Sequence, residues 1–307
     1  MNLKKPKFWD YNYLSIYAYL LLPVAFIISL LSKINKKKRN QFKIETICVG
    51  NFYIGGTGKT SLCIKINKIL NEKKIKSCFV KKFYENQIDE QKLLEKNGKL
   101  FLSSKRKDAI LEAENENFEI AILDDGLQDK SISNDVSFVC FNTINWIGNG
   151  LTIPAGPLRE TMDNLKYYNH VFLNGNLENL EKIKIEIFKI NPLINIYIGK
   201  YKILNLNEFD FSKKYLIFSG IGNHQTFVST VKSSGLNIVE DIEFPDHYNY
   251  KKKDIENIIN QSNKLGCNII TTEKDHLRLK NLDIDKIKFI KSDLEISNMD
   301  RIIKSII

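Results

Sequence analysis

Short apolar runs alternate along the chain with polar segments in which apolar residues recur at helical spacing. The runs have the length of buried strands and predict strands over residues 43–50, 76–82 and 118–125. The helical spacing predicts helices over residues 61–73, 90–95 and 108–116. Such alternation is typical of βαβ units, so we expect an α/β fold with a mostly parallel sheet.

The alternation continues toward the C-terminus and is interrupted once, by a polar stretch at residues 205–214. Before this stretch, strands are predicted over 136–142, 170–175 and 194–199. After it, strands are predicted over 215–222, 236–244, 267–275 and 286–296, and helices over 224–234 and 251–265. We interpret the polar stretch as a boundary between a domain over 40–205 and a smaller α/β domain over 206–307.

Residues 13–31 form an uncharged apolar segment near the N-terminus. As a helix this segment reaches roughly 29 Å, about the thickness of one hydrocarbon core. Pro23 in its middle, the aromatic residues at its start and the basic residues on both sides favour a helix lying in the membrane interface. Spanning and lying flat both stay open, as does a buried soluble helix. We expect residues 1–39 to associate with a membrane, and the basic cluster over 33–39 places the following domain in the cytoplasm.

The net charge of +10 favours an anionic partner, such as phospholipid, a phosphorylated substrate or nucleic acid. A general preference for lysine in the composition of the chain explains the charge equally well. We expect no nucleic-acid partner, because no basic stripe interleaved with aromatic residues lies outside the apolar segment. The five cysteines are scattered without a C-x-x-C pair, which suits reduced thiols, and Cys48, Cys63 and Cys140 fit core positions.

A glycine-rich loop between the first predicted strand and helix carries the strongest chemical signal. Glycines let backbone N–H groups approach a phosphate, and the helix N-terminus adds partial positive charge. Lys59 is expected to reach the β- and γ-phosphates, and the Thr60 hydroxyl to bind Mg²⁺. The full P-loop motif has a glycine where this chain has Tyr53, so an incidental glycine turn is the alternative. The expected nucleotide-binding residues are Tyr53, Ile54, Gly55, Gly56, Thr57, Gly58, Lys59 and Thr60.

Two adjacent carboxylates, Asp124 and Asp125, end the third predicted strand. Like charges repel unless a cation lies between them, and a P-loop needs a carboxylate that holds Mg²⁺ directly or through water. Together with Thr60 they form the predicted metal site. A simple turn at Asp-Asp-Gly is the alternative.

The chain resembles the tetraacyldisaccharide 4'-kinase family in six motifs that follow one another in the family's order. They are VGNFYIGGTGKT (49–60), LDDGLQ (123–128), IPAGPLRE (153–160), FSGIGNHQTF (218–227), FPDHYNY (244–250) and TTEKD (271–275). The resemblance implies a P-loop kinase that transfers the γ-phosphate of ATP, with Mg²⁺, to the 4'-hydroxyl of a tetraacylated glucosamine disaccharide 1-phosphate in lipid A biosynthesis. It also implies a hydrophobic N-terminal helix at the cytoplasmic face of the bacterial inner membrane. We expect a monomer.

The resemblance also implies roles for single residues. IDEQKLL (88–94) is similar to the family's GDEPLLL, so Asp89 is implied to be the carboxylate near the sugar hydroxyl, with His247 across from it. Lys59, Asp124 and Asp125 complete the implied catalytic set. Substrate contacts are implied for Glu90, Gln128, Arg159, Glu160 and Asp246.

Three departures from the family pattern concern the loops around this set. KKFYENQ (81–87) replaces SRGYGR, although Lys81 and Lys82 keep positive charge there. Asp129 replaces a histidine, and Gln91 replaces a proline. These changes affect the loops and leave the catalytic residues as they are.

Two rival functions use similar loops. Membrane-partitioning ATPases place a lysine directly before the paired glycines, where this chain has Ile54. Regulatory GTPases carry an Asn/Thr-Lys-x-Asp element, and TTEKDH has the wrong spacing. We therefore expect a lipid kinase, with the partitioning-type ATPase as the alternative.

Overall fold

The computed structural model of the chain describes residues 5–11, 13–34, 39–175, 179–279 and 286–306. These residues divide into two compact units. The first comprises the described parts of 1–83, 94–199 and 296–307, and the second comprises 84–93 and the described parts of 200–295. The domain bounds predicted from the sequence stay predictions. The two units differ from them in placing residues 84–93 and 200–205 with the second unit and the described residues from 296 onward with the first.

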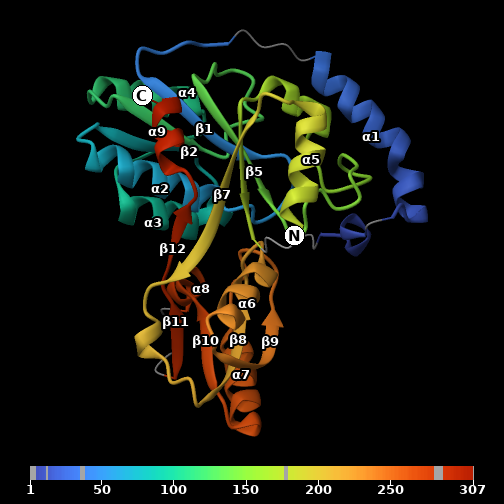
Figure 1. Ribbon diagram of the computed structural model, residues 1–307, viewed down its shortest axis with the longest axis vertical. Helices are drawn as coiled ribbons and strands as arrows, with labels where there is room; N and C mark the ends of the chain where they lie inside the picture. Colours follow the sequence, from blue (N-terminus) through green and yellow to red (C-terminus); the bar gives the residue numbers. More distant parts are fainter. Residues whose placement is uncertain (1–4, 12, 35–38, 176–178, 280–285, 307) are drawn as a thin grey trace. The chain divides into compact units, whose positions relative to one another are not determined.

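An eight-stranded sheet in the order β12-β7-β6-β5-β1-β4-β2-β3 forms the centre of the first unit (Figure 1). Its strands are β1 (Glu45–Asn51), β2 (Ser77–Lys82), β3 (Leu100–Ser103), β4 (Ile120–Asp124), β5 (Val136–Asn142), β6 (His170–Asn174), β7 (Asn195–Ile203) and β12 (Ser292–Ile296). From β7 to β3 the neighbouring strands are parallel. Central strands such as β4 are buried along their whole length, as expected for parallel strands covered on both faces.

Helices lie on both faces of this sheet: α4 and α5 pack into one hydrophobic core on one face, and the buried residues of α2 lie outside that core, on the other face. The helices of the first unit are α1 (Ile16–Ile34), α2 (Lys59–Glu72), α4 (Arg106–Asn115), α5 (Leu180–Ile190) and α9 (Met299–Ile306), with short 3-10 helices at Lys7–Asp10 and Met162–Tyr167. The strand order runs one way from β1 through α2 to β2 and the other way from β6 through α5 to β7. In open α/β sheets, ligands bind outside the carboxyl ends of the strands at such a reversal. The glycine loop follows β1 at this point.

The second unit contains a four-stranded parallel sheet in the order β11-β10-β8-β9. Its strands are β8 (Lys214–Ser219), β9 (Asn237–Glu243), β10 (Asn268–Thr272) and β11 (Ile287–Ile290), and its helices are α6 (His224–Ser233), α7 (Lys252–Leu265) and α8 (Glu273–Arg278), with 3-10 turns at Glu85–Gln87 and Leu206–Glu208. Alternate residues of β8 face two separate cores, with Ile217 in one and Leu216 and Phe218 in the other. The sheet is therefore packed on both faces. The chain passes between the units directly after residue 83 and again within α3 (Ile88–Asn97), β7 and β12.

The predicted α/β class, the mostly parallel sheet and the smaller α/β part are confirmed. The sequence analysis missed the short strand β3 and the helices α5, α8 and α9. It also predicted one strand over 286–296, where the chain forms β11 and β12 in two different sheets. Cys48, Cys63 and Cys140 are buried free thiols, as predicted.

The apolar N-terminal segment forms α1, with Pro23 inside the helix. Ala18 and Ala25 are buried, whereas most of its large apolar side chains are exposed, including Leu20 at 71%. Within the described ranges, no helix is both long and apolar enough to cross a membrane. Of the basic residues predicted to flank this segment, Lys4 and residues 36–38 lie outside the described part of the chain.

Candidate functional site

The glycine loop joins β1 to α2, as the sequence predicted, and α2 begins at Lys59. Gly55 and Gly58 have φ angles of 140° and 77°, which a side chain would disfavour. Thr57 is buried, whereas Gly55, Gly56 and the residues from Gly58 to Thr60 are partly exposed. The loop therefore has an open backbone of the kind suited to phosphate binding at the start of a helix.

Three buried asparagines support the loop, two by direct hydrogen bonds and the third, Asn142, through Asn174. The Asn51 amide donates to the Tyr53 carbonyl at 2.6 Å and to the Thr57 hydroxyl at 3.0 Å. Asn174 donates to the Thr57 carbonyl at 2.7 Å and accepts a hydrogen bond from Asn142 at 2.9 Å. The sequence analysis missed this set, although its signal was present: each asparagine is the last residue of an apolar strand, and β1, β5 and β6 are neighbours.

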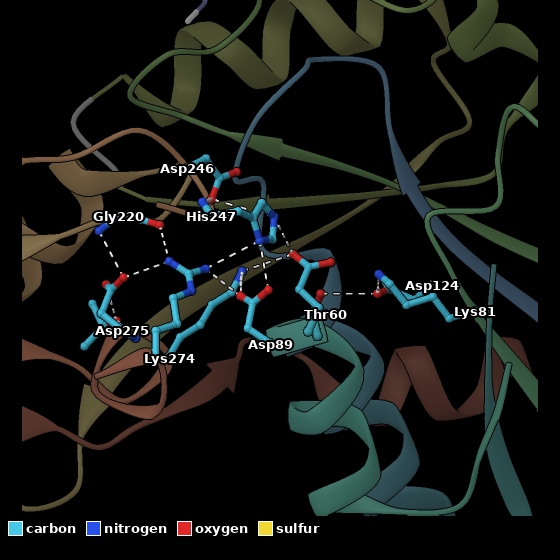
Figure 2. Close-up of polar contacts among 12 residues, drawn as sticks. Thr60, Lys81, Asp89, Asp124, Gly220, Asp246, His247, Lys274 and Asp275 are labelled. Carbon is cyan, nitrogen blue, oxygen red and sulfur yellow. Dashed lines mark hydrogen bonds and ion pairs between the residues drawn. The ribbon is translucent and has the colours of Figure 1, made fainter. Parts of the chain in front are cut away.

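Asp124 and Asp125 lie at the end of β4, and each has its own cationic partner. The Lys81 ammonium is 2.6 Å from Oδ2 of Asp124, and the Thr60 hydroxyl is 3.3 Å from the same oxygen (Figure 2). Asp125 Oδ1 is 2.7 Å from Arg159 and 3.8 Å from the Lys59 ammonium. The repulsion between the two carboxylates is therefore offset by side chains of the protein itself, and a metal ion is not needed to explain the pair.

Asp125 has a left-handed backbone and a perturbed carboxyl group. Its φ angle is 58°, and Arg106, which the sequence analysis missed, donates to its carbonyl at 2.5 Å. Burial raises the pKa of the Asp125 carboxyl, but the charges of Lys59 and Arg159 outweigh it and lower the pKa to about 2. Asp125 is thus ionised at neutral pH and fixed in position from both its backbone and its side chain.

The IPAGPLRE motif brings further predicted residues to Asp125. The Arg159 N–H donates to the Phe52 carbonyl at 2.6 Å, which fixes the motif to the start of the glycine loop. The Arg159 side chain also donates to Gln128 at 3.1 Å, and Gln128 in turn donates to Glu160 at 3.0 Å. Gln128, Arg159 and Glu160 therefore form one hydrogen-bonded group with Asp125. The backbone N–H of Ile54 donates to Pro157 at 2.9 Å, on the same motif.

Tyr53 replaces the first glycine of the P-loop motif, and its side chain points to the N-terminal segment. Its hydroxyl donates to Asp10 at 2.5 Å and accepts from Lys5 at 2.7 Å. Burial, together with Asp10, raises the pKa of Tyr53 well above its usual value. Trp9 is fixed to the first unit as well, because its indole N–H donates to the Pro154 carbonyl at 3.0 Å. Residues 5–10 are thus attached to the loop through the tyrosine.

The oxygen atoms of Thr60, Asp124 and Asp125 are the kind of donor that Mg²⁺ prefers. The contact of Thr60 with Asp124 brings a hydroxyl and a carboxylate to one place. Among the described residues, no group of three or more histidine, cysteine or acidic side chains is arranged to hold a metal ion. These donors therefore fit a Mg²⁺ that takes its other ligands from phosphates and water, as is usual for this ion.

In the second unit, Asp89 is the centre of a charged cluster at the start of α3 (Figure 2). Its Oδ1 is 2.9 Å from Nδ1 of His247, the predicted partner. Its Oδ2 is 2.5 Å from Arg278 and 3.1 Å from the Lys274 ammonium. The structure thus brings the predicted pair together, while the catalytic role of the pair stays a prediction.

The other predicted acidic residues of this unit surround His247. Glu90 is 3.1 Å from Lys274 and 3.6 Å from Nε2 of His247, and Asp246 is 3.8 Å from that nitrogen. His247 has a φ angle of 57°, and its N–H donates to Gly220 at 3.1 Å. The imidazole is therefore held by a fixed turn among three carboxylates.

Lys274 and Arg278 were not predicted as site residues. They lie four residues apart on α8 and therefore on one face of that helix. Arg278 is also held by Asp275, a fully buried carboxylate 2.9 Å away that in addition accepts hydrogen bonds from Tyr250 and the Gly220 N–H. The TTEKD motif was noted in the sequence, but only the fold shows that it directs two cations at Asp89.

These contacts set the charge of Asp89. Burial raises the pKa of its carboxyl, but the hydrogen bond from His247 and the charges of Lys274 and Arg278 outweigh burial and hold the pKa well below its usual range. Burial lowers the pKa of Lys274, but the charges of Glu90, Asp89 and Asp246 outweigh burial and raise this pKa. Asp89 is therefore an ionised, weakly basic carboxylate and a good acceptor of hydrogen bonds.

Comparison with known proteins gives a consistent result. Residues 13–307 match the family model for LpxK, tetraacyldisaccharide-1-P 4'-kinase. The tetraacyldisaccharide 4'-kinase of Pelagibacter ubique is 59% identical over 299 residues, which cover 97% of this chain and 95% of that protein. The enzyme of the same name from Rickettsia akari is 32% identical over 322 residues, covering 98% and 95%. A crystal structure of LpxK from Aquifex aeolicus in complex with ATP has a TM-score of 0.68 at 20% identity and covers 95% of this chain and 98% of that one, which shows a shared fold.

Proposed function

The chain belongs to the tetraacyldisaccharide 4'-kinase family, and from this premise we propose which of its residues carry the reaction. The reaction is an ATP-dependent phosphoryl transfer to the 4'-hydroxyl of tetraacyldisaccharide 1-phosphate, an alcohol acceptor, in lipid A biosynthesis. The new bond joins the 4'-oxygen to the γ-phosphorus, the bond from that phosphorus to the β–γ bridging oxygen breaks, and ADP leaves.

The first unit binds the nucleotide in this proposal. The backbone of residues 53–60 surrounds the phosphates, and Lys59 leaves its 3.8 Å contact with Asp125 to neutralise the β- and γ-phosphates. Thr60, Asp124 and Asp125 would hold Mg²⁺, which would neutralise charge on the phosphate oxygens. The contact of Thr60 with Asp124 is the observation that carries this assignment, because it joins the first turn of α2 to the end of β4.

The second unit supplies the groups that act on the alcohol. Asp89 accepts the hydrogen bond of the 4'-hydroxyl and takes its proton as the new bond forms, and His247 and Arg278 orient the carboxylate. A weakly basic carboxylate is sufficient, because phosphoryl transfer with a loose transition state needs little proton abstraction in advance. Asp89 therefore acts mainly by orientation.

The remaining predicted residues are proposed to contact the substrates or to position the side chains that do. Arg159 has a planar guanidinium of the kind that binds phosphate in two places. It can exchange its contact with Asp125 for a contact with a phosphate. Gln128 and Glu160 position Arg159 through their hydrogen bonds. In the second unit, Glu90 and Asp246 keep His247 and Lys274 in place for the acceptor.

The test of this function uses the purified protein, γ-labelled ATP, Mg²⁺ and tetraacyldisaccharide 1-phosphate in detergent micelles. We expect a labelled bisphosphorylated lipid, and we expect Asp89→Asn to reduce its formation without reducing ATP binding. Release of labelled phosphate in place of labelled lipid would favour the alternative, a membrane-associated ATPase of the partitioning type. No ATP turnover of either kind would contradict both functions.

We propose in addition that α1 lies on the cytoplasmic face of the bacterial inner membrane, where a monomer of the enzyme meets its lipid substrate without any nucleic-acid partner. Large apolar side chains cover the exposed part of α1, and Leu20 and Ile27 are 71% and 56% exposed. Exposure of such a contiguous apolar surface to water is unfavourable. The helix is therefore suited to the boundary between head groups and acyl chains.

Flotation with phospholipid vesicles tests this membrane proposal. Leu20→Glu and Ile27→Glu place charges on the apolar surface of α1 and should each reduce the bound fraction. Leu193→Glu is the matched control, because Leu193 is 90% exposed and lies away from α1 in the sequence. Equal flotation of all three variants and the unmodified protein would contradict the assignment of α1.

A further inference from the structure

Lys81 is a buried lysine on β2 whose ammonium contacts the Asp124 carboxylate. The Nζ–Oδ2 distance is 2.6 Å, and the two side chains are 2% and 0% exposed. Figure 2 shows the pair with Thr60, whose hydroxyl contacts the same oxygen at 3.3 Å. Lysine is rarely found this deeply buried without a charged partner, and Asp124 is such a partner for Lys81.

The carboxylate oxygen that Lys81 contacts is also the one required by the proposed Mg²⁺ site. A divalent ion that binds Thr60 and Asp124, directly or through water, lies near Oδ2 of Asp124. There it meets the positive charge of the ammonium, and two cations at one oxygen repel each other strongly in a poorly hydrated place. Lys81 therefore weakens the attraction of Asp124 for a divalent ion.

The neighbouring carboxylate is neutralised in the same way. Asp125 lies 2.7 Å from Arg159 and 3.8 Å from Lys59. Each carboxylate of the pair thus has a protein cation, and together they present little negative charge to a metal ion. The phosphates of a nucleotide carry the negative charge that the protein does not supply at this site.

We propose that Lys81 is a positioning residue that makes divalent-cation binding at Asp124 depend on the nucleotide. Without nucleotide, the ammonium neutralises Asp124, and the ion is attracted weakly. With nucleotide, the phosphates attract the ion, which enters as its complex with the nucleotide. This inference rests on the metal role proposed above for Thr60, Asp124 and Asp125, and it deepens that role.

The experiment measures Mn²⁺ binding by electron paramagnetic resonance to the full-length protein, with and without ADP. Lys81→Met replaces the lysine by another unbranched side chain, which is apolar, and so removes the charge. Without nucleotide, we expect this variant to bind Mn²⁺ at least about tenfold more tightly than the unmodified protein, because one nearby positive charge is lost. With ADP, the difference should become smaller, since the phosphates then provide most of the attraction.

Two further variants separate charge from structural support. Lys81→Arg restores a cation and should return Mn²⁺ binding to its original value. Lys99→Met removes a lysine from a half-exposed pair with Glu116 in the same unit and should leave Mn²⁺ binding unchanged. A role for Lys81 in stability alone would lower the melting temperature of Lys81→Met without changing its affinity for Mn²⁺.

A folded Lys81→Met protein with unchanged affinity for Mn²⁺ would overturn the proposal. If that variant does not fold, the unmodified protein still decides, because the proposal requires Mn²⁺ binding to be at least about tenfold tighter with ADP than without it. Equal binding in both conditions would overturn it. The lipid substrate is absent from this experiment, so its outcome is independent of whether the enzyme phosphorylates lipid.

Discussion

Replacing Arg278 by glutamine tests the charged cluster around Asp89. The arginine is 11% exposed, and it contacts Asp89 at 2.5 Å, Asp275 at 2.9 Å and the Gly220 carbonyl at 2.6 Å. Glutamine keeps a polar side chain but is shorter and uncharged. The variant therefore removes one cation that the partly buried Asp89 and the fully buried Asp275 share.

The cost follows from the contacts that remain. Removing one partner of a buried ion pair typically destabilises a protein by about 3–5 kcal/mol. Here Lys274 still lies 3.1 Å from Asp89, and Asp275 still accepts hydrogen bonds from Tyr250 and the Gly220 N–H. We therefore expect the lower end of the range, about 3 kcal/mol of unfolding free energy.

Urea unfolding followed by circular dichroism measures this loss, and hydrogen exchange of peptides covering residues 268–279 locates it. Trp9 and Trp146 both belong to the first unit, so the unfolding transition followed by tryptophan fluorescence should be the same in the variant and the unmodified protein. Arg301→Gln is the matched control, because Arg301 is exposed and the change should stay within about 0.5 kcal/mol. Unchanged exchange over 268–279 and a loss no larger than that of the control would refute the reasoning.

The pH dependence of this loss has a definite sign. Burial opposes ionisation of Asp89, but the contacts with His247, Lys274 and Arg278 hold its folded pKa below the unfolded value. The stabilisation is therefore fully present above the unfolded pKa, near 4, and is lost only as the pH falls through the folded pKa. The difference between Arg278→Gln and the unmodified protein should be constant from about pH 5 to 8, and a difference confined to one end of this range would implicate another group.

Three further predictions concern the first unit. Lys59→Ala should lower lipid phosphorylation by about 10³-fold or more, by analogy with other phosphate-clamping cations, and near-normal turnover in a labelled-ATP assay would contradict the site. Asn174→Ala removes the hydrogen bond to Thr57 and should raise the KM for ATP about tenfold, whereas Asn67→Ala, a buried asparagine that does not contact the loop in any described hydrogen bond, should leave the KM unchanged. Tyr53→Phe removes the hydroxyl shared by Asp10 and Lys5 and should cost about 1–2 kcal/mol, with a matching change in Trp9 fluorescence; an unchanged spectrum would show that residues 5–10 stay attached without it.

Much of the first unit follows from local sequence. Strands such as β1 and β4 are continuous apolar runs, and the glycine loop lies where one of them meets a helix. β3 was missed because it has only four residues, of which one is buried. α9 was missed because it has only eight residues and lies after the last predicted strand.

The cluster around Asp89 shows where local sequence is insufficient. Asp89 is one acidic residue at a polar helix start, and its partners His247 and Arg278 lie 158 and 189 residues further along the chain. Nothing in a window of ten or twenty residues connects them. Lys81 is a similar case, because a lysine at the end of a strand normally faces water, and only the pairing of β2 with β4 brings it to Asp124.

The placement of residues 84–93 with the second unit has a consequence for synthesis on the ribosome. Asp89 leaves the ribosome early, whereas Arg278 follows 189 residues later. At a synthesis rate of about 5–20 residues per second, roughly 10–40 seconds pass between the synthesis of Asp89 and that of its cationic partners. During that time the nascent chain already contains the complete glycine loop and the Asp124–Asp125 pair. The charged cluster around Asp89 is therefore complete only when the chain is nearly finished, so a protein truncated before α8 is expected to keep its glycine loop and lose the environment of Asp89.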